Sequence, residues 1–247
     1  MISMNRLINI ILRISALGIR FLFIFFLAKY IDAGSLGYYG IFTATIAYGM
    51  VFVGFEFFIY VTRDLINSAV EDRGRMLKGH AALSGILYLA LLPAVTVFLY
   101  QADWPKHLYL WFVPILILEH FNQEVYRLLV TMSEQVTASA LLFLRQASWA
   151  IATIIMMSLS DTALTLDTIM LFWLIAGLVS AMLGLRKVRR IQIGGWRRSI
   201  DWAWVRRGLL IAAPFLLATL AQRGIFTFDR YWLEAIGGPE VVGAYVL

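Results

Sequence analysis

The sequence contains seven uninterrupted apolar stretches, each long enough to cross a lipid bilayer as a helix. A helix rises about 1.5 Å per residue, so a hydrocarbon core about 30 Å thick requires about 20 residues. The stretches lack the alternating polarity of a lipid-facing barrel strand, and a helix satisfies its own backbone hydrogen bonds in lipid. The predicted spans are 10–31, 38–60, 81–99, 108–132, 136–159, 166–185 and 209–233.

Composition agrees with this class of protein. Of 247 residues, 61% are hydrophobic and 15% are charged, with a mean hydropathy of +0.79. A soluble domain carries about 25% charged residues. The absence of cysteine excludes disulfides, thiolate catalysis and cysteine metal sites. The first apolar stretch contains Arg13 and Arg20 and lacks an A-x-A cleavage pattern, so we expect a retained helix. We predict an all-α integral membrane protein, a polytopic helical bundle.

The connection 186–207 is strongly basic and rich in tryptophan. It holds eight Lys/Arg against one acid, Asp201, together with Trp196, Trp202 and Trp204. Between two membrane spans this pattern indicates a cytoplasmic loop that contacts anionic membrane lipids, and we expect no nucleic acid as a partner. Connections on the same side hold thirteen Lys/Arg, whereas the opposite connections hold one. We therefore expect a cytoplasmic N-terminus and a seventh helix that runs outward.

A short pattern occurs twice, once after the first span and once after the seventh. Residues 33–39, AGSLGYY, resemble residues 237–245, GGPEVVGAY, because in both a glycine turn leads into Gly followed by Tyr. The two preceding helices have the same predicted orientation, which indicates a parallel six-helix repeat, and we expect 241–247 to start an eighth helix of a longer protein. The predicted parts are a six-helix lobe (1–185), the basic loop (186–207) and the start of a C-terminal lobe (208–247).

Arginines occur inside the predicted spans, where each charge costs at least ~2.5 kcal/mol. Arg6, Arg13 and Arg20 recur every seven residues and share one face of the first helix. Arg6 can extend to the headgroups. Arg13 lies at the depth of Glu56 on the second span, so we predict that these two pair. Arg20 is deeper and has no acid at its level, which favours water or an anionic ligand beside it.

The fourth span carries the densest polar cluster. Its members are Glu119, His120, Gln123, Glu124 and Arg127. Glu119, Gln123 and Arg127 follow i, i+4, i+8 spacing, with His120 and Glu124 on the neighbouring stripe. Glu124 lies at the depth of Arg145 on the fifth span, so we predict a buried pair. The cluster either locks the fourth and fifth helices together or serves function, and a structural role for His120 is favoured over a catalytic one.

The seventh span repeats the pattern. Its polar stripe consists of Thr219, Gln222, Arg223, Thr227 and Arg230, with Asp229 beside it. Asp229 and Arg230 lie near the outer end of the span, where an interfacial ion pair is expected. Arg223 is deeper and is the counterpart of Arg20.

These features together resemble a known family. The chain resembles polysaccharide-biosynthesis flippases in its six helices, its basic tryptophan-containing loop and its seventh helix with Asp-Arg before GGPEVVGAY. These flippases are the O-antigen type of lipid-linked oligosaccharide transporter in the multidrug/oligosaccharidyl-lipid/polysaccharide exporter superfamily. The segments FLAKYIDAGSLGYYGIF, EHFNQEVYRLL and LFLRQASW also resemble members, although the opening turn is about two residues shorter than the family form. The resemblance covers essentially the whole chain and ends about halfway through a family member.

The resemblance implies two six-helix lobes around a central cavity that opens alternately to each side of the bacterial inner membrane. It also implies an undecaprenyl-pyrophosphate-linked glycan as cargo and polysaccharide assembly machinery as a partner. Pyrophosphate suits arginine forks. Candidates for the anionic headgroup site are Arg13, Arg20, Arg145 and Arg223. Candidates for coupling or ion pairing are Glu56, Glu119, His120, Glu124, Arg127, Asp229 and Arg230. We expect no cofactor, metal or catalytic residue.

Two other functions compete with the flippase hypothesis. A drug exporter of the same superfamily would need an acidic cavity for organic cations, whereas the deep sites here are richer in arginine. A membrane-embedded glycan polymerase or acyltransferase using His120 would need a large extramembrane loop or a clustered catalytic set. The histidines His80, His107 and His120 are scattered, and the sequence has no Asp-x-Asp, P-loop or dinucleotide glycine motif. We therefore expect a transporter and not an enzyme.

Overall fold

The computed structural model describes residues 4–101, 104–159 and 165–247, and all regular secondary structure within those ranges is helical. The elements are α1 (Met4–Tyr30), α2 (Ala33–Gly54), α3 (Phe58–Asn67), α4 (Val70–Gln101), α5 (Lys106–Thr131), α6 (Gln135–Phe143), the π-helix η1 (Leu144–Ser148), α7 (Trp149–Leu159), α8 (Leu166–Val188) and α9 (Trp202–Val246). Six helical stretches of the described residues are long and apolar enough to cross a membrane. The predicted all-α polytopic membrane bundle is confirmed.

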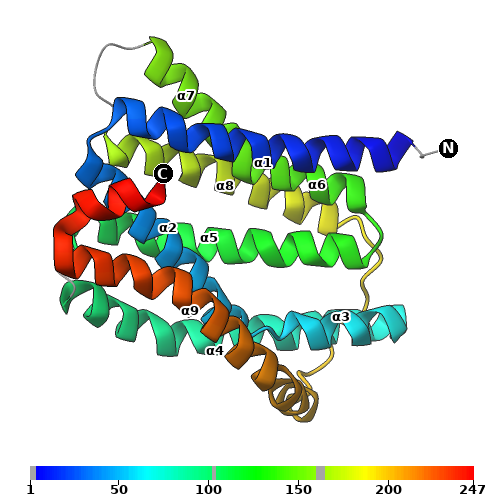
Figure 1. The fold of residues 1–247 in the computed structure, drawn as a ribbon. Coiled ribbons are helices and arrows are strands. Elements are labelled where there is room, and N and C mark those ends of the chain that lie inside the picture. Colours follow the sequence, from blue (N-terminus) through cyan, green and yellow to red (C-terminus); the bar gives the residue numbers. More distant parts are fainter. Residues whose placement is uncertain (1–3, 102–103, 160–164) are drawn as a thin grey trace.

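The helices form one bundle in which α1, α5 and α8 run in roughly the same line across the view (Figure 1). α8 packs along α5, and α6 packs along α1. Aromatic side chains fill the space between these helices, with Trp149 stacked on Trp173 at 5.3 Å between ring centroids and Phe23 against Trp149 at 4.9 Å. This part of the bundle therefore has an apolar core, and polar side chains inside it need a specific account.

Several predicted spans differ from the observed helices. The predicted span 38–60 is interrupted, because Phe55 and Glu56 adopt left-handed backbone with φ of 52° and 51° and end α2 at Gly54. α4 begins at Val70, well before the predicted residue 81. α5 has 26 residues but is not among the six apolar stretches, since its polar cluster lowers its hydropathy. Residues 102–103 and 160–164 of two predicted connections lie outside the described residues.

The most extensive packing in the bundle joins α2 to α9. Gly238, with φ of 77°, bends α9 so that its last residues turn back beside the start of α2 (Figure 1). Gly37 and Gly243 meet at this crossing. A Cβ atom on Gly37 would lie 1.9 Å from the carbonyl oxygen of Pro239, and one on Gly243 would lie 2.2 Å from that of Ala33. The two glycine turns that resemble each other in sequence thus pack reciprocally, backbone against backbone.

The basic connection is held against the start of α4. The Gly74 amide donates to the carbonyl of Gly194 at 2.8 Å, and the Gly194 amide donates to the carbonyl of Val70 at 2.9 Å. Trp196 and Trp202 are about half exposed, at 49% and 53%. An interfacial position was also expected for Trp204, and this is wrong: Trp204 is buried.

Trp204 is buried because α3 covers it. Its indole donates to Asp64 at 2.7 Å, and its ring packs against Phe57 at 5.5 Å between centroids. A tryptophan whose N–H finds a carboxylate partner can be buried at little cost. The tryptophan therefore ties the start of α9 to α3.

Candidate functional site

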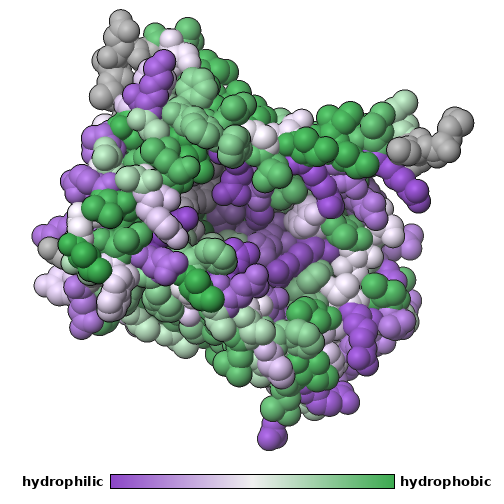
Figure 2. Space-filling view, in the orientation of Figure 1, coloured by the Kyte–Doolittle hydropathy of each residue, from purple (hydrophilic) through white to green (hydrophobic). Residues whose placement is uncertain are grey.

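A hydrophilic hollow opens on one face of the bundle, between α1 and α9 (Figure 2). It consists of two parts that we call together the arginine groove. The larger part has a volume of about 460 Å³, and its polar lining comprises Arg13, Arg20, Tyr39, Tyr126 and Gln146. The smaller part has a volume of about 70 Å³, and its polar lining comprises Glu56, Gln123, Arg127, Thr219 and Arg223. Helix α5 contributes side chains to both parts, Tyr126 to the larger and Gln123 and Arg127 to the smaller.

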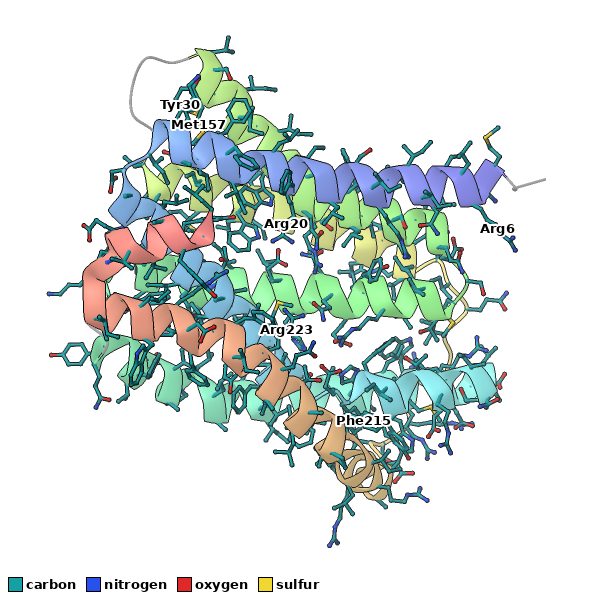
Figure 3. The ribbon with its side chains drawn as sticks, viewed as in Figure 1. Arg6, Arg20, Tyr30, Met157, Phe215 and Arg223 are labelled. Atoms are coloured by element: carbon teal, nitrogen blue, oxygen red, sulfur yellow. The ribbon has the colours of Figure 1, made fainter. Side chains whose placement is uncertain are left out.

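Arg20 and Arg223 stand on opposite walls of the arginine groove. Arg20 projects from α1 and Arg223 from α9, and both side chains extend into the space between these helices (Figure 3). Within the described part of the chain, no carboxylate lies within 4.0 Å of either guanidinium, although such pairs are found for Arg75, Arg127, Arg145 and Arg198. The two arginines that the sequence singled out as counterparts are therefore brought to one groove without a neutralising acid.

Arg13 lies at the end of the same groove, but its predicted pair with Glu56 is wrong. Its Nε donates to the Ser139 hydroxyl at 3.2 Å, and its guanidinium lies over the Tyr126 ring at 5.9 Å. Glu56 does not continue the second helix, as a pair with Arg13 at equal depth would require. Because the left-handed turn ends α2 first, Glu56 instead lines the smaller part of the groove with Arg127.

Arg145 lies outside the groove. Its side chain is only 6% exposed, and its Nη1 lies 3.5 Å from Glu119 Oε2 and donates to the Glu119 carbonyl at 3.0 Å. Glu119 also accepts a hydrogen bond from Trp173 at 2.8 Å. The predicted pair of Glu124 with Arg145 is therefore wrong. Arg145 sits in η1, and a π-helical turn adds one residue, so the faces that an ideal α-helix would present are rotated.

Glu124 instead joins α5 to α4. Its Oε2 lies 3.7 Å from His80 Nε2, while its Oε1 lies 3.8 Å from His120 Nε2 and 2.9 Å from Arg127 Nη1. Arg127 also lies over the Phe58 ring, with 5.2 Å to the centroid. The polar cluster of α5 thus points in three directions: Glu119 toward α8 and η1, His120 and Glu124 toward α4, and Arg127 into the arginine groove.

The sequence prediction missed His80, which it assigned to a connection. His80, Ser84 and Tyr88 are spaced i, i+4, i+8 on α4 and line one apolar hollow, which we call the α4–α5 hollow. This hollow has a volume of about 390 Å³ and is also lined by His120 and Glu124. The spacing is visible in the sequence, but His80 lies just before residue 81, where the predicted span begins.

The predicted ion pair of Asp229 with Arg230 is not formed. Arg230 turns toward α2, where its Nη1 donates to the Gly40 carbonyl and lies 3.5 Å from the Thr43 hydroxyl. Asp229 is exposed. Adjacent residues on a helix project about 100° apart, so the two side chains meet different neighbours. Arg230 therefore joins α9 to α2 near their crossing.

Among residues 4–101, 104–159 and 165–247, no three His, Asp or Glu side chains are placed to hold a metal ion. Comparison of the chain with protein-family models, with curated proteins and with solved structures found no match. The function is therefore argued from the arginine groove.

Proposed function

We propose that this chain forms part of a flippase that moves a polyprenyl-pyrophosphate-linked oligosaccharide from the cytoplasmic to the outer leaflet of a bacterial inner membrane by alternating access. One observation carries the proposal: Arg20 from α1 and Arg223 from α9 both extend into the arginine groove (Figure 3), and neither has a carboxylate within 4.0 Å among the described residues. A cation at hydrocarbon depth costs at least ~2.5 kcal/mol. Arginines kept there without an acid are accounted for by an anionic ligand, and pyrophosphate accepts two parallel hydrogen bonds from a guanidinium.

The charge of the groove favours an anion over an organic cation. The groove lining contains Arg13, Arg20 and Arg223 against one acid, Glu56, and its fourth arginine, Arg127, is paired with Glu124. A drug exporter for organic cations would need the opposite balance. Arginines in such a groove also disfavour organic cations, because like charges repel each other.

The groove also suits a ligand that is lipid at one end. Leu17 and Phe21 line its larger part and are 72% and 64% exposed on the outer surface of α1. An anionic headgroup can therefore enter between the arginines while its hydrocarbon chain stays beside apolar side chains. A free water-soluble anion would not need this apolar edge.

The test is binding of farnesyl pyrophosphate to the purified chain in detergent, measured by isothermal titration calorimetry. Replacement of Arg20 or Arg223 by alanine removes charge-assisted hydrogen bonds worth about 1.5–3 kcal/mol, so we expect the dissociation constant to rise about tenfold or more. Arg6→Ala is the control. It removes the same charge from the same helix as Arg20, but at the end of α1, away from the groove (Figure 3).

An equal loss of affinity in Arg6→Ala and Arg20→Ala would mean that farnesyl pyrophosphate binds through non-specific electrostatic attraction, and this would refute the proposal. Tetraphenylphosphonium tests the exporter of organic cations. If that cation binds more tightly than farnesyl pyrophosphate and arginine replacement improves its binding, the cargo is cationic.

A further inference from the structure

Glu124 lies between the arginine groove and the α4–α5 hollow. On one side its Oε1 pairs with Arg127 at 2.9 Å, and Arg127 lines the groove with Arg223. On the other side it is flanked by His80 Nε2 at 3.7 Å and His120 Nε2 at 3.8 Å, both in the hollow. The Glu124 carboxylate therefore lies beside Arg127, which lines the candidate site, and beside two imidazoles, which do not line it.

The two histidines are buried without a hydrogen-bond partner for their Nε2 atoms. Their side chains are 8% and 7% exposed, and neither Nε2 finds a donor or acceptor among the described residues. Each nitrogen is directed at a different oxygen of the same carboxylate, at a distance too long for a hydrogen bond. Buried polar atoms left in this way are rare and require an explanation.

The groups that face Glu124 are few. His80 and Tyr88 come from α4, His120 and Arg127 from α5, and Glu56 from the turn between α2 and α3. The hollow lining contributed by α3 and α8 is apolar. With neutral imidazoles, Glu124 and Arg127 compensate each other, and Glu56 is the one further carboxylate near them in the described structure.

A metal ion does not explain the cluster. No set of three His, Asp or Glu within the described ranges has metal-binding geometry, and the guanidinium 2.9 Å from the carboxylate would repel a divalent cation. A proton is the ligand that remains, because each of the three groups can accept one. Added to any of them, it raises the charge of the cluster by one.

We propose that Glu124, His80 and His120 form a proton-binding site whose occupancy sets the charge that Arg127 offers to the arginine groove. When the cluster is deprotonated, the Glu124 carboxylate neutralises Arg127. When the cluster binds a proton, the carboxylate either becomes neutral or is shared with an imidazolium. Arg127 can then join Arg223 in binding an anion. This inference rests on the proposed function, because it assigns a coupling proton to the same groove.

The experiment measures farnesyl pyrophosphate binding to the purified chain between about pH 5.5 and about pH 8, the range in which histidine clusters exchange protons. The probe itself titrates, so wild type is compared with Glu124→Gln at each pH. Glu124→Gln keeps the side-chain shape but fixes the charge at zero. We expect it to bind the probe on the order of tenfold more tightly than wild type at the highest pH and equally at the lowest.

Linkage supplies a second readout. If a bound proton strengthens anion binding, then anion binding must take up protons, and calorimetry in two buffers of different ionisation enthalpy counts them. Wild type is expected to take up more protons than Glu124→Gln. Arg127→Gln must bind more weakly and lose the same pH dependence. Glu134→Gln is the control, because Glu134 pairs with Lys187 at 2.8 Å, away from both cavities, and this variant should match wild type.

Identical pH profiles and proton uptake in wild type and Glu124→Gln would overturn the proton site while leaving the proposed function in place. Should Glu124→Gln fail to fold, a wild-type pH profile in Arg127→Gln would overturn it equally. If folded wild type binds no probe at any pH, the proposed function fails, and the inference that rests on it fails with it.

Discussion

The Gly37–Gly243 crossing predicts a sharp difference between glycines of the same helical bundle. A methyl group on Gly37 would lie 1.9 Å from the Pro239 carbonyl oxygen, which is 1.5 Å short of ordinary contact at 3.4 Å. The obstacle is backbone, so it cannot rotate away as a side chain does. Gly37→Ala therefore forces the start of α2 and the end of α9 apart.

The cost can be scaled from overpacking in well-packed cores, which is typically about 1–3 kcal/mol. For a chain of this size, a loss of about 2 kcal/mol lowers the melting temperature by about 4–8 °C. The assay is thermal unfolding of the purified protein in detergent, followed by tryptophan fluorescence. Gly243→Ala should give a similar loss, because its methyl would lie 2.2 Å from the Ala33 carbonyl oxygen.

Gly18→Ala is the matched control. No atom lies within 4 Å of a Cβ built on Gly18, which is exposed on α1. Alanine in a helix is favoured over glycine by about 1 kcal/mol, so this variant should be unchanged or slightly more stable. The double variant Gly37→Ala/Gly243→Ala should lose less than the two single losses combined, since one separation accommodates both methyl groups. Equal melting temperatures for Gly37→Ala and Gly18→Ala would refute the backbone contact.

Three further outcomes are expected. Glu119→Gln leaves the Arg145 cation buried without its partner charge and should lower the free energy of unfolding by about 3–5 kcal/mol, measured by chemical denaturation in detergent. Lys187→Ala removes a partly exposed pair and should cost less than about 1 kcal/mol in the same assay. Hydrogen bonds from Ser35 hold the pKa of Asp32 below its ordinary value of 3.8. Asp32→Ala should therefore cost about 1 kcal/mol at neutral pH, and this difference should vanish as pH falls through the lowered pKa, because wild type then loses the same cap.

Hydrophobic length alone predicted the helical bundle, because the cost of exposing backbone to lipid leaves few alternatives. Side-chain partners were harder to predict, since they depend on helix irregularities. The sequence places Glu124 and Arg145 at the same depth, yet η1 rotates Arg145 toward Glu119. The sequence LRQAS of η1 contains no feature that predicts a π-helical turn. Depth along a helix can be counted from the sequence, whereas rotation about its axis depends on packing that the sequence does not display.

A second helix irregularity places Glu56 elsewhere than predicted. Glu56 was expected on a continuous helix opposite Arg13, but two successive left-handed residues place it in the smaller part of the groove. Such residues cost of order 1–3 kcal/mol each and persist where the surroundings hold them, often at functional sites. Neither Phe55 nor Glu56 is a residue type that favours this backbone, so the break could not be predicted from propensity.

The contrast between the buried and groove-facing charges decides how the site is interpreted. Glu119 holds the buried Arg145, and Glu124 holds Arg127 where Arg127 reaches the groove. Charge in the interior is therefore compensated by the chain itself. Arg20 and Arg223 lie on the two helices that border the groove, and among the described residues neither guanidinium has a carboxylate within 4.0 Å. A protein that neutralises its inner cations so consistently has the means to neutralise these two. Their lack of an acidic partner is thus a property of the groove. An anion that enters and leaves the groove compensates the charge of these two arginines while it is bound.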